Sequence, residues 1–258
     1  MVRIKKEWLL FFFLLAGCNN NSVSPEAALY KGVCLTFDDT YVDQWYNISQ
    51  LFLENEIQAT FFVTKINSLP QSNLSKLEEL HKAGFEIGSH GYNHLNANDY
   101  LQNHTLDEYY ENEILPSIKG LESLNIPVKS FSYPYGMNND SLDTFLLQYF
   151  DVLRDITDEQ RKPLDKEVDK IEEIYFTKGD KPVISSLGID NNFKIDLENL
   201  KKALERADRN NEVLILYAHC PVDSDPIAYQ ITDEYLSELI KLIKEAGLKT
   251  YTCSDLVK

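Results

Sequence analysis

The chain has 258 residues, of which 43% are hydrophobic, so it can form the core of one large domain or two small ones. It carries 41 acidic and 25 basic residues, which give a formal net charge of −16 at pH 7. Proteins bind nucleic acids through Lys and Arg side chains that neutralise phosphates, so this composition argues against a nucleic-acid partner. The negative charge otherwise indicates a solvated acidic surface.

The first part of the chain predicts an exported lipoprotein. Residues 1–17 have a basic start and an apolar run, residues 8–15, that is too short to span a bilayer, which is typical of a signal peptide. The sequence LAGC that ends at Cys18 resembles the bacterial lipobox, in which the cysteine is lipidated and becomes the mature N-terminus. An ordinary signal peptide with a chance cysteine is the alternative. Residues 18–29 then predict a polar tether, and we expect a lipid-anchored protein of the bacterial cell envelope.

From residue 30 onward, short apolar runs alternate with segments of helical periodicity. We expect a capping box at Thr105 and Glu108 at the start of one helix, which Pro116 is expected to kink. The predicted strands are 31–37, 58–64, 85–89, 128–133, 150–156, 182–189, 212–218 and 248–253. The predicted helices are 43–55, 72–83, 105–124, 140–149, 197–211 and 233–246.

This alternation predicts an α/β fold with a parallel sheet covered by helices. About seven strand–helix units without a dinucleotide-binding glycine pattern favour a parallel (β/α) barrel in a single domain, residues 30–258. An open, doubly wound sheet is the alternative. Three cysteines remain after Cys18, an odd number, and no two of them have CxxC spacing, so the sequence indicates neither a disulfide framework nor a thiolate zinc site.

Polar residues follow four of the predicted strands. Asp38 and Asp39 come directly after the first, the histidines of GSHGYNH (residues 88–94) after the third, the YPYG segment with Tyr135 after another, and His219 after a late one. Active sites of parallel α/β barrels lie at the carboxyl ends of the strands. All four clusters are therefore expected to meet on one rim of the barrel.

Two histidines and a carboxylate are a common ligand set for a catalytic divalent metal ion. His90 and His94 are four residues apart and share the predicted rim with the aspartate pair. Taken alone, each histidine could be a surface or core residue, and the aspartates could cap the next helix. Because the clusters converge, we interpret them as a metal site.

Four short motifs resemble those of the polysaccharide deacetylases, also called carbohydrate esterase family 4 or the NodB-homology domain. The motifs are TFDD at 36–39, SHGYNH at 89–94, YPYG at 133–136 and LYAH at 216–219. The resemblance implies a distorted (β/α) barrel that removes N- or O-acetyl groups from glycans. It extends over the whole predicted domain.

The resemblance also implies the role of each site residue. Asp39, His90 and His94 would bind one divalent metal ion, usually Zn²⁺, while Asp38 would be the general base and His219 the general acid. The chemistry agrees, because an amide carbonyl is a poor electrophile that needs polarisation, a base for the attacking water and an acid for the leaving amine. The backbone N–H of Tyr135, the second tyrosine of YPYG, is expected to donate to the oxyanion.

Two family features are missing. The third motif usually carries an arginine that contacts the base aspartate, and this chain has Ser132 there. The usual fourth motif, an aspartate pair followed by tryptophan, has no match in VLRDITDEQR, residues 152–161. We hypothesise that Arg154, at the end of a neighbouring strand, takes over the role of the missing arginine, since its planar guanidinium can bind a carboxylate in bidentate fashion. A surface arginine is the alternative.

These features lead to a hypothesis with two alternatives. The chain is expected to be a metal-dependent hydrolase that removes acetyl groups, N-acetyl first, from a cell-surface or exported polysaccharide. The alternatives are an inactive glycan-binding lipoprotein that keeps the fold, and an O-acetyl esterase acting on glycans. Asp38 and His219 favour an enzyme, because a binding protein needs neither a base nor an acid.

Overall fold

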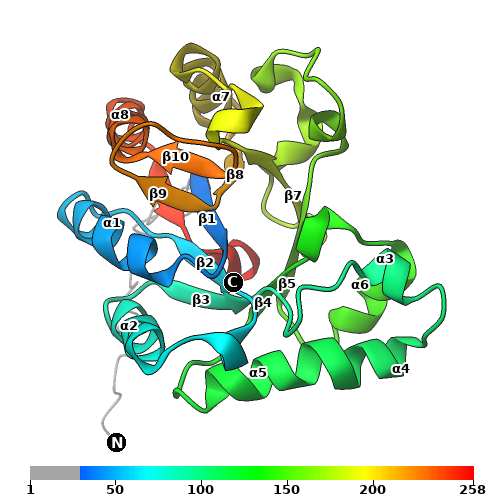
Figure 1. Ribbon diagram of the computed structural model, residues 1–258. Helices are drawn as coiled ribbons and strands as arrows, with labels where there is room; N and C mark the ends of the chain where they lie inside the picture. The colour runs from blue at the N-terminus through cyan, green and yellow to red at the C-terminus, as the bar shows by residue number, and fades with distance from the viewer. Residues whose placement is uncertain (1–29) are drawn as a thin grey trace, which may run out of the picture.

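Seven parallel strands close into a barrel in the computed structural model, which describes residues 30–258 (Figure 1). Strand β1 closes the ring because it pairs in parallel with β2 on one side and with β8 on the other. The predicted parallel barrel is therefore confirmed. Its strands are β1 Gly32–Asp39, β2 Thr60–Val63, β3 Glu86–Ser89, β4 Ser130–Ser132, β5 Val152–Ile156, β7 Val183–Gly188 and β8 Val213–Ala218.

Helices surround the barrel (Figure 1). The predicted capping box is present, since Thr105 and Glu108 bond each other's backbone N–H groups at the start of α4. The helices are α1 Val42–Glu54, α2 Gln71–Lys82, α3 Ala97–Tyr100, α4 Leu106–Tyr109, α5 Leu115–Glu122, α6 Asp140–Leu146, α7 Leu197–Asn210 and α8 Asp233–Glu245. Among residues 30–258, no helix is both long enough and apolar enough to cross a membrane.

Strand β1 packs on both of its faces. Leu35 and Phe37 face the helices and belong to one buried cluster with Trp45 of α1. Cys34 points into the barrel and belongs to a second cluster, which includes Phe62. Each fully buried large apolar side chain stabilises the fold by roughly 1.5–3 kcal/mol. Because successive side chains of a strand point to opposite faces, Asp38 continues the inward-facing row of Cys34 at the carboxyl end of β1.

The predicted helix 105–124 is interrupted. Between α4 and α5 the chain forms one π-helical turn, Tyr110–Ile114, and Pro116 then lies in the first turn of α5. Proline has no N–H for the carbonyl four residues earlier, so the break falls where the sequence predicts a kink.

Other elements were not predicted. Strand β6, Tyr175–Phe176, pairs with β8 in antiparallel fashion, within a segment for which the sequence predicts no regular structure. Strands β9, Cys220–Val222, and β10, Gln230–Thr232, form a small separate sheet after β8. The last predicted strand is present as β11, Lys249–Tyr251, which pairs with the start of β1 outside the ring.

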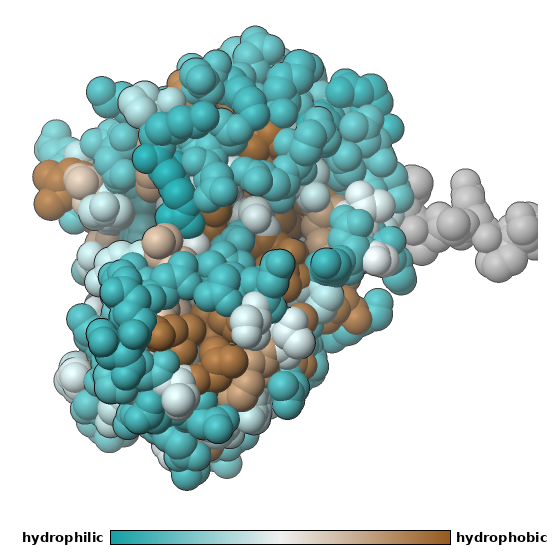
Figure 2. All heavy atoms as spheres, turned by 90° about the vertical axis from the view of Figure 1, so that its right-hand side faces the viewer, coloured by the Kyte–Doolittle hydropathy of each residue, from teal (hydrophilic) through white to brown (hydrophobic). Residues whose placement is uncertain are grey.

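The surface agrees with the charge of the chain. Figure 2 shows a mostly hydrophilic face, on which apolar side chains are visible mainly where the surface is recessed. The three described cysteines, Cys34, Cys220 and Cys253, are free and buried. The predicted signal peptide and tether, including Cys18, lie outside the described residues.

Candidate active site

Strand β1 delivers two consecutive carboxylates to the same rim of the barrel. Regular strand geometry would turn Asp38 and Asp39 to opposite faces, but Asp39 has φ of 90°, and this left-handed backbone redirects its side chain. Nε2 of His90 accordingly lies 3.9 Å from Oδ2 of Asp38 and 3.8 Å from Oδ1 of Asp39. The two aspartates therefore face one site.

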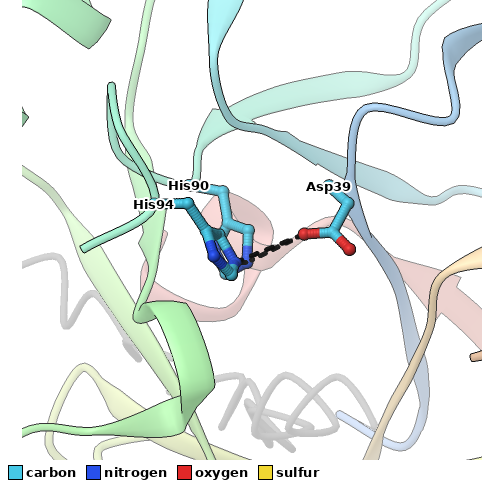
Figure 3. A group of neighbouring side chains, drawn as sticks. All are labelled: Asp39, His90 and His94. Carbon is cyan, nitrogen blue, oxygen red and sulfur yellow. Dashed lines mark hydrogen bonds and ion pairs between the residues drawn. The ribbon is translucent and has the colours of Figure 1, made fainter. Parts of the chain in front are cut away.

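Asp39, His90 and His94 converge on one point (Figure 3). Nε2 of His94 lies 3.3 Å from Oδ1 of Asp39 and 3.2 Å from Nε2 of His90. Two ligand atoms of a tetrahedral zinc ion, each about 2.1 Å from the metal, lie about 3.4 Å apart. The spacing and the donor types of these three residues therefore fit a divalent metal ion.

The orientation of the imidazole rings supports the same interpretation. Nδ1 of His90 lies 2.8 Å from the carbonyl oxygen of Ser132 and donates to it, which leaves the lone pair of Nε2 directed at the cluster. Burial, with the nearby His90, lowers the pKa of His94 to about 4, so its imidazole is neutral at pH 7. Neutral imidazoles are the form that binds metals.

Arg154 lies where the sequence hypothesis requires it. Its Nη2 donates to both carboxylate oxygens of Asp38, and both side chains are buried. The guanidinium carbon lies 5.4 Å from the ring centre of Phe62 and 5.0 Å from that of Tyr217. Arg154 of β5 is the register partner of Ser132 of β4. The guanidinium therefore comes from the strand next to the one that carries the position of the usual motif arginine.

The ion pair controls the protonation of Asp38. Burial alone would raise the pKa of this carboxyl, but the Arg154 guanidinium, aided by His90 and His219, lowers it below its usual value. Asp38 is therefore ionised at neutral pH. The pair stabilises the fold above the unfolded-state pKa of about 3.9, and this contribution is lost as the pH falls through the lower folded-state pKa.

His219 is held by an aspartate that the sequence analysis missed. Asp190 lies two residues after the end of β7, is fully buried, and accepts from the backbone N–H of His219 at 3.0 Å and from its Nδ1 at 2.6 Å. Trp45 of α1 fixes the same residue from behind, donating through Nε1 to the His219 carbonyl at 2.8 Å. Burial lowers the pKa of His219, but Asp190, aided by Asp38 and Asp39, outweighs that effect, and the net pKa is raised.

A groove of about 580 Å³ connects these groups. Asp38, Asp39, both metal-site histidines and His219 all line it, together with Arg154 and several tyrosines. Tyr135 and Tyr229 are 58% and 53% exposed, and their rings lie edge-on to His94 and His219, with ring centres 4.7 and 5.2 Å apart. The groove therefore has one exposed aromatic ring beside His94 and another beside His219.

Residues 27–149 match the polysaccharide deacetylase family model. The predicted resemblance to the polysaccharide deacetylases is confirmed. The match contains the two aspartates, both metal-site histidines and the YPYG segment, and it ends before Arg154, Asp190 and His219. Those three residues are placed at the site by the structure.

One protein with a similar sequence and two with similar structures are described as deacetylases or as members of carbohydrate esterase family 4. A peptidoglycan-N-acetylglucosamine deacetylase of Bacillus cereus is 34% identical over 116 residues, 43% of this chain, and the aligned part spans only half of that relative. A carbohydrate esterase family 4 pseudoenzyme from Bacillus anthracis has a TM-score of 0.58 at 18% identity, over 88% of this chain and 66% of its own. For a peptidoglycan deacetylase mutant from Bacillus subtilis the TM-score is 0.53 at 18% identity, over 88% and 90%. At these identities the structures show a shared polysaccharide deacetylase fold.

The Asp38–Arg154 ion pair can be tested with Arg154→Met. Without the guanidinium, burial raises the pKa of Asp38, so the acid limb of the pH–rate profile should move to higher pH, because a base must be ionised to act. Thermal unfolding should also show a loss of stability of about 3–5 kcal/mol, because a buried carboxylate has lost its partner. Metal content should stay the same.

Arg206→Met is a matched control. Arg206 is also a buried arginine, paired with Glu172 and Glu212, but it lies in α7 and does not line the groove. Its loss should lower stability and leave the acid limb in place. An acid limb in Arg154→Met that coincides with the wild type would contradict the assignment of Arg154 to Asp38.

The pairing of Asp190 with His219 predicts a shift of the alkaline limb. Asp190→Asn removes the charge that raises the pKa of His219, so burial should then lower this pKa. A general acid must be protonated, so activity on an N-acetylglucosamine oligomer should fall at lower pH than in the wild type. Hydrolysis of 4-nitrophenyl acetate, whose leaving group needs no proton, serves as the control and should keep its alkaline limb. Equal shifts with both substrates would exclude His219 as the acid.

Proposed function

We propose that this chain is a metal-dependent hydrolase that removes acetyl groups, N-acetyl first, from a polysaccharide of the cell surface. One observation carries the proposal: a single groove brings Asp38, Asp39, His90, His94 and His219 together. Metal-type donors, a buried paired carboxylate and a paired histidine are the parts that deacetylation of an amide requires.

Asp39, His90 and His94 would hold the ion, and Zn²⁺ suits their nitrogen and oxygen donors. A divalent ion at this place supplies a Lewis acid that polarises the acetyl carbonyl and makes a water molecule more acidic. Asp38, kept ionised by Arg154, lies beside the cluster and accepts the proton of the attacking water. The arginine therefore sets the pH range in which Asp38 can act as the base.

The remaining steps concern the oxyanion and the leaving amine. The backbone N–H of Tyr135, at the edge of the groove next to His94, would donate to the developing oxyanion. His219 carries a raised pKa and would give its proton to the departing nitrogen. Asp190 holds Nδ1, so the proton leaves from Nε2.

The groove also suggests the substrate class. The exposed rings of Tyr135 and Tyr229 can pack on the apolar faces of sugars on either side of the reacting acetyl group. The Bacillus cereus relative is described as acting on peptidoglycan N-acetylglucosamine. We therefore propose an N-acetylated glycan such as peptidoglycan as the first substrate to test.

An inactive glycan-binding protein is the contrasting possibility, and pseudoenzymes exist among the structural neighbours. Two ion pairs with buried carboxylates argue for activity here. Burying charges costs free energy even when they are paired, and glycan binding requires neither Asp38–Arg154 nor Asp190–His219. The Asp190–His219 pair also favours amides over esters as substrates, because an amine leaving group depends more on protonation than an alcohol does.

The test is acetate release from N-acetylated peptidoglycan and from O-acetylated xylan, with added zinc or with chelator. We expect faster release from peptidoglycan and loss of activity with chelator. Asp38→Asn should retain its metal and lose about two to four orders of magnitude in turnover, the usual scale for general acid–base catalysis. The double variant His90→Ala/His94→Ala should lack metal by elemental analysis.

Several outcomes would change the proposal. No acetate from either polymer, together with retained glycan binding, would support the inactive binding protein. Faster release from xylan would support the esterase. Equal metal content in the wild type and in the double histidine variant would remove these residues as ligands.

We also propose that the protein is exported and lipid-anchored in the bacterial cell envelope through Cys18. The support is the sequence of residues 1–29, a basic and apolar start, LAGC and a polar tether, which suits a domain that acts on a cell-surface polymer. Cells fed a fatty-acid probe should label the wild type, and Cys18→Ala should be unlabelled and leave the membrane fraction. A labelled, membrane-bound Cys18→Ala protein would contradict the anchor.

A further inference from the structure

Glu113 is a fully buried carboxylate that takes no part in the chemistry described above. It lies in the π-helical turn between α4 and α5 and contacts the loop that carries His94. Its Oε2 accepts from the backbone N–H of Asn93 at 2.8 Å, and its Oε1 accepts from that of Leu95 at 2.9 Å. The two bonded peptide groups thus stand on either side of His94.

The backbone of the same turn holds the loop as well. The N–H of Tyr92 donates to the Glu113 carbonyl at 3.0 Å, and the Asn93 side chain donates to the Asn112 carbonyl at 3.1 Å. Pro116 lies four residues after Asn112 and has no N–H, so this carbonyl lacks its usual helical donor. The interrupted helix therefore offers the loop both a side chain and backbone carbonyl groups.

The contact leaves no spare room. Gly91 has φ of 78°, and a Cβ atom there would lie 2.3 Å from Oε1 of Glu113. His94 itself has φ of 63°, a left-handed conformation that few non-glycine residues adopt without support. Burial raises the pKa of the Glu113 carboxyl, and the N–H donors of Leu95 and Asn93 oppose that rise. The loop and the carboxylate therefore stabilise each other.

We infer that Glu113 is a positioning residue for the metal site: it fixes the left-handed backbone at His94 and so directs Nε2 of His94 toward Asp39 and His90. The inference rests on the metal site proposed above. Without the carboxylate, the loop loses the two backbone N–H bonds that flank the ligand and one bond from the Asn93 side chain, and His94 is free to turn away. His90 keeps its own support, the bond from Nδ1 to Ser132.

The experiment measures Zn²⁺ affinity of the purified chain by competition with a chromophoric chelator. Glu113→Gln keeps the size of the side chain but turns an NH₂ group toward N–H donors, so we expect affinity to fall by about 10–100-fold, the usual range for residues that orient metal ligands. Circular dichroism should show a folded protein. Asn93→Ala is the matched control, because it removes only side-chain bonds and keeps the backbone N–H. It should bind zinc more tightly than Glu113→Gln does, because both backbone N–H bonds to the carboxylate remain.

A second background separates positioning from general structural support. In a His94→Ala chain there is no ligand left to position, so adding Glu113→Gln should cause no further loss of zinc affinity. The same loss in both backgrounds would overturn the inference, as would wild-type affinity in a folded Glu113→Gln protein. If Glu113→Gln does not fold, Gly91→Ala tests the contact from the loop side and should give the same pattern; wild-type affinity there would overturn the inference. A wild-type chain that binds no zinc would overturn the proposed metal site, and the inference about Glu113 with it.

Discussion

The site depends on the closure of the barrel between β1 and β8. The register of this pair places Phe37 opposite Ala218, so Asp38, the next residue of one strand, and His219, the next residue of the other, emerge side by side. These residues are 181 positions apart in the chain and approach each other only because the ring closes. An open sheet with the same strands would leave β1 and β8 at separate places and would divide the base from the acid.

Several residues on the rim of the barrel have a left-handed backbone conformation, which directs their side chains or N–H groups into the groove. Asp39, His94 and Tyr135 all have positive φ, between 60° and 90°, and each lies in the groove lining. Such conformations cost about 1–3 kcal/mol each and persist only where neighbouring structure maintains them. For His94 that structure is the turn carrying Glu113, which connects a distant helix break to the direction of one imidazole. The strained backbone at His94 thus depends on hydrogen bonds to Glu113, a residue outside the groove.

The sequence predicted what depends on local pattern. Strand ends, the polar residues that follow them and the capping box are visible in a single chain, and parallel topology then brings Asp38, His90 and His219 to one rim. Asp190 was missed although it directly follows the predicted strand 182–189, because its role depends on β7 lying next to β8, a pairing that no local signal shows. The π-helical turn could not be predicted either, since Pro116 indicates a break but not the form that the break takes.

Two ion pairs with buried carboxylates shift the pKa of the base and that of the acid in opposite directions. Asp38 has a lowered pKa because Arg154 opposes the effect of burial, and His219 has a raised pKa because Asp190 does. A base works above its pKa and an acid below its own, so both residues are in their working forms between the two values. Unpaired aspartate and histidine would share only the interval from about 3.9 to about 6.5. The partners widen this interval at both ends and carry its upper limit toward neutral pH, where an unassisted histidine would already have lost most of its protons. Because Asp38 is buried and His219 is largely shielded from water, the two partners allow an ionised base and a protonated acid to exist together.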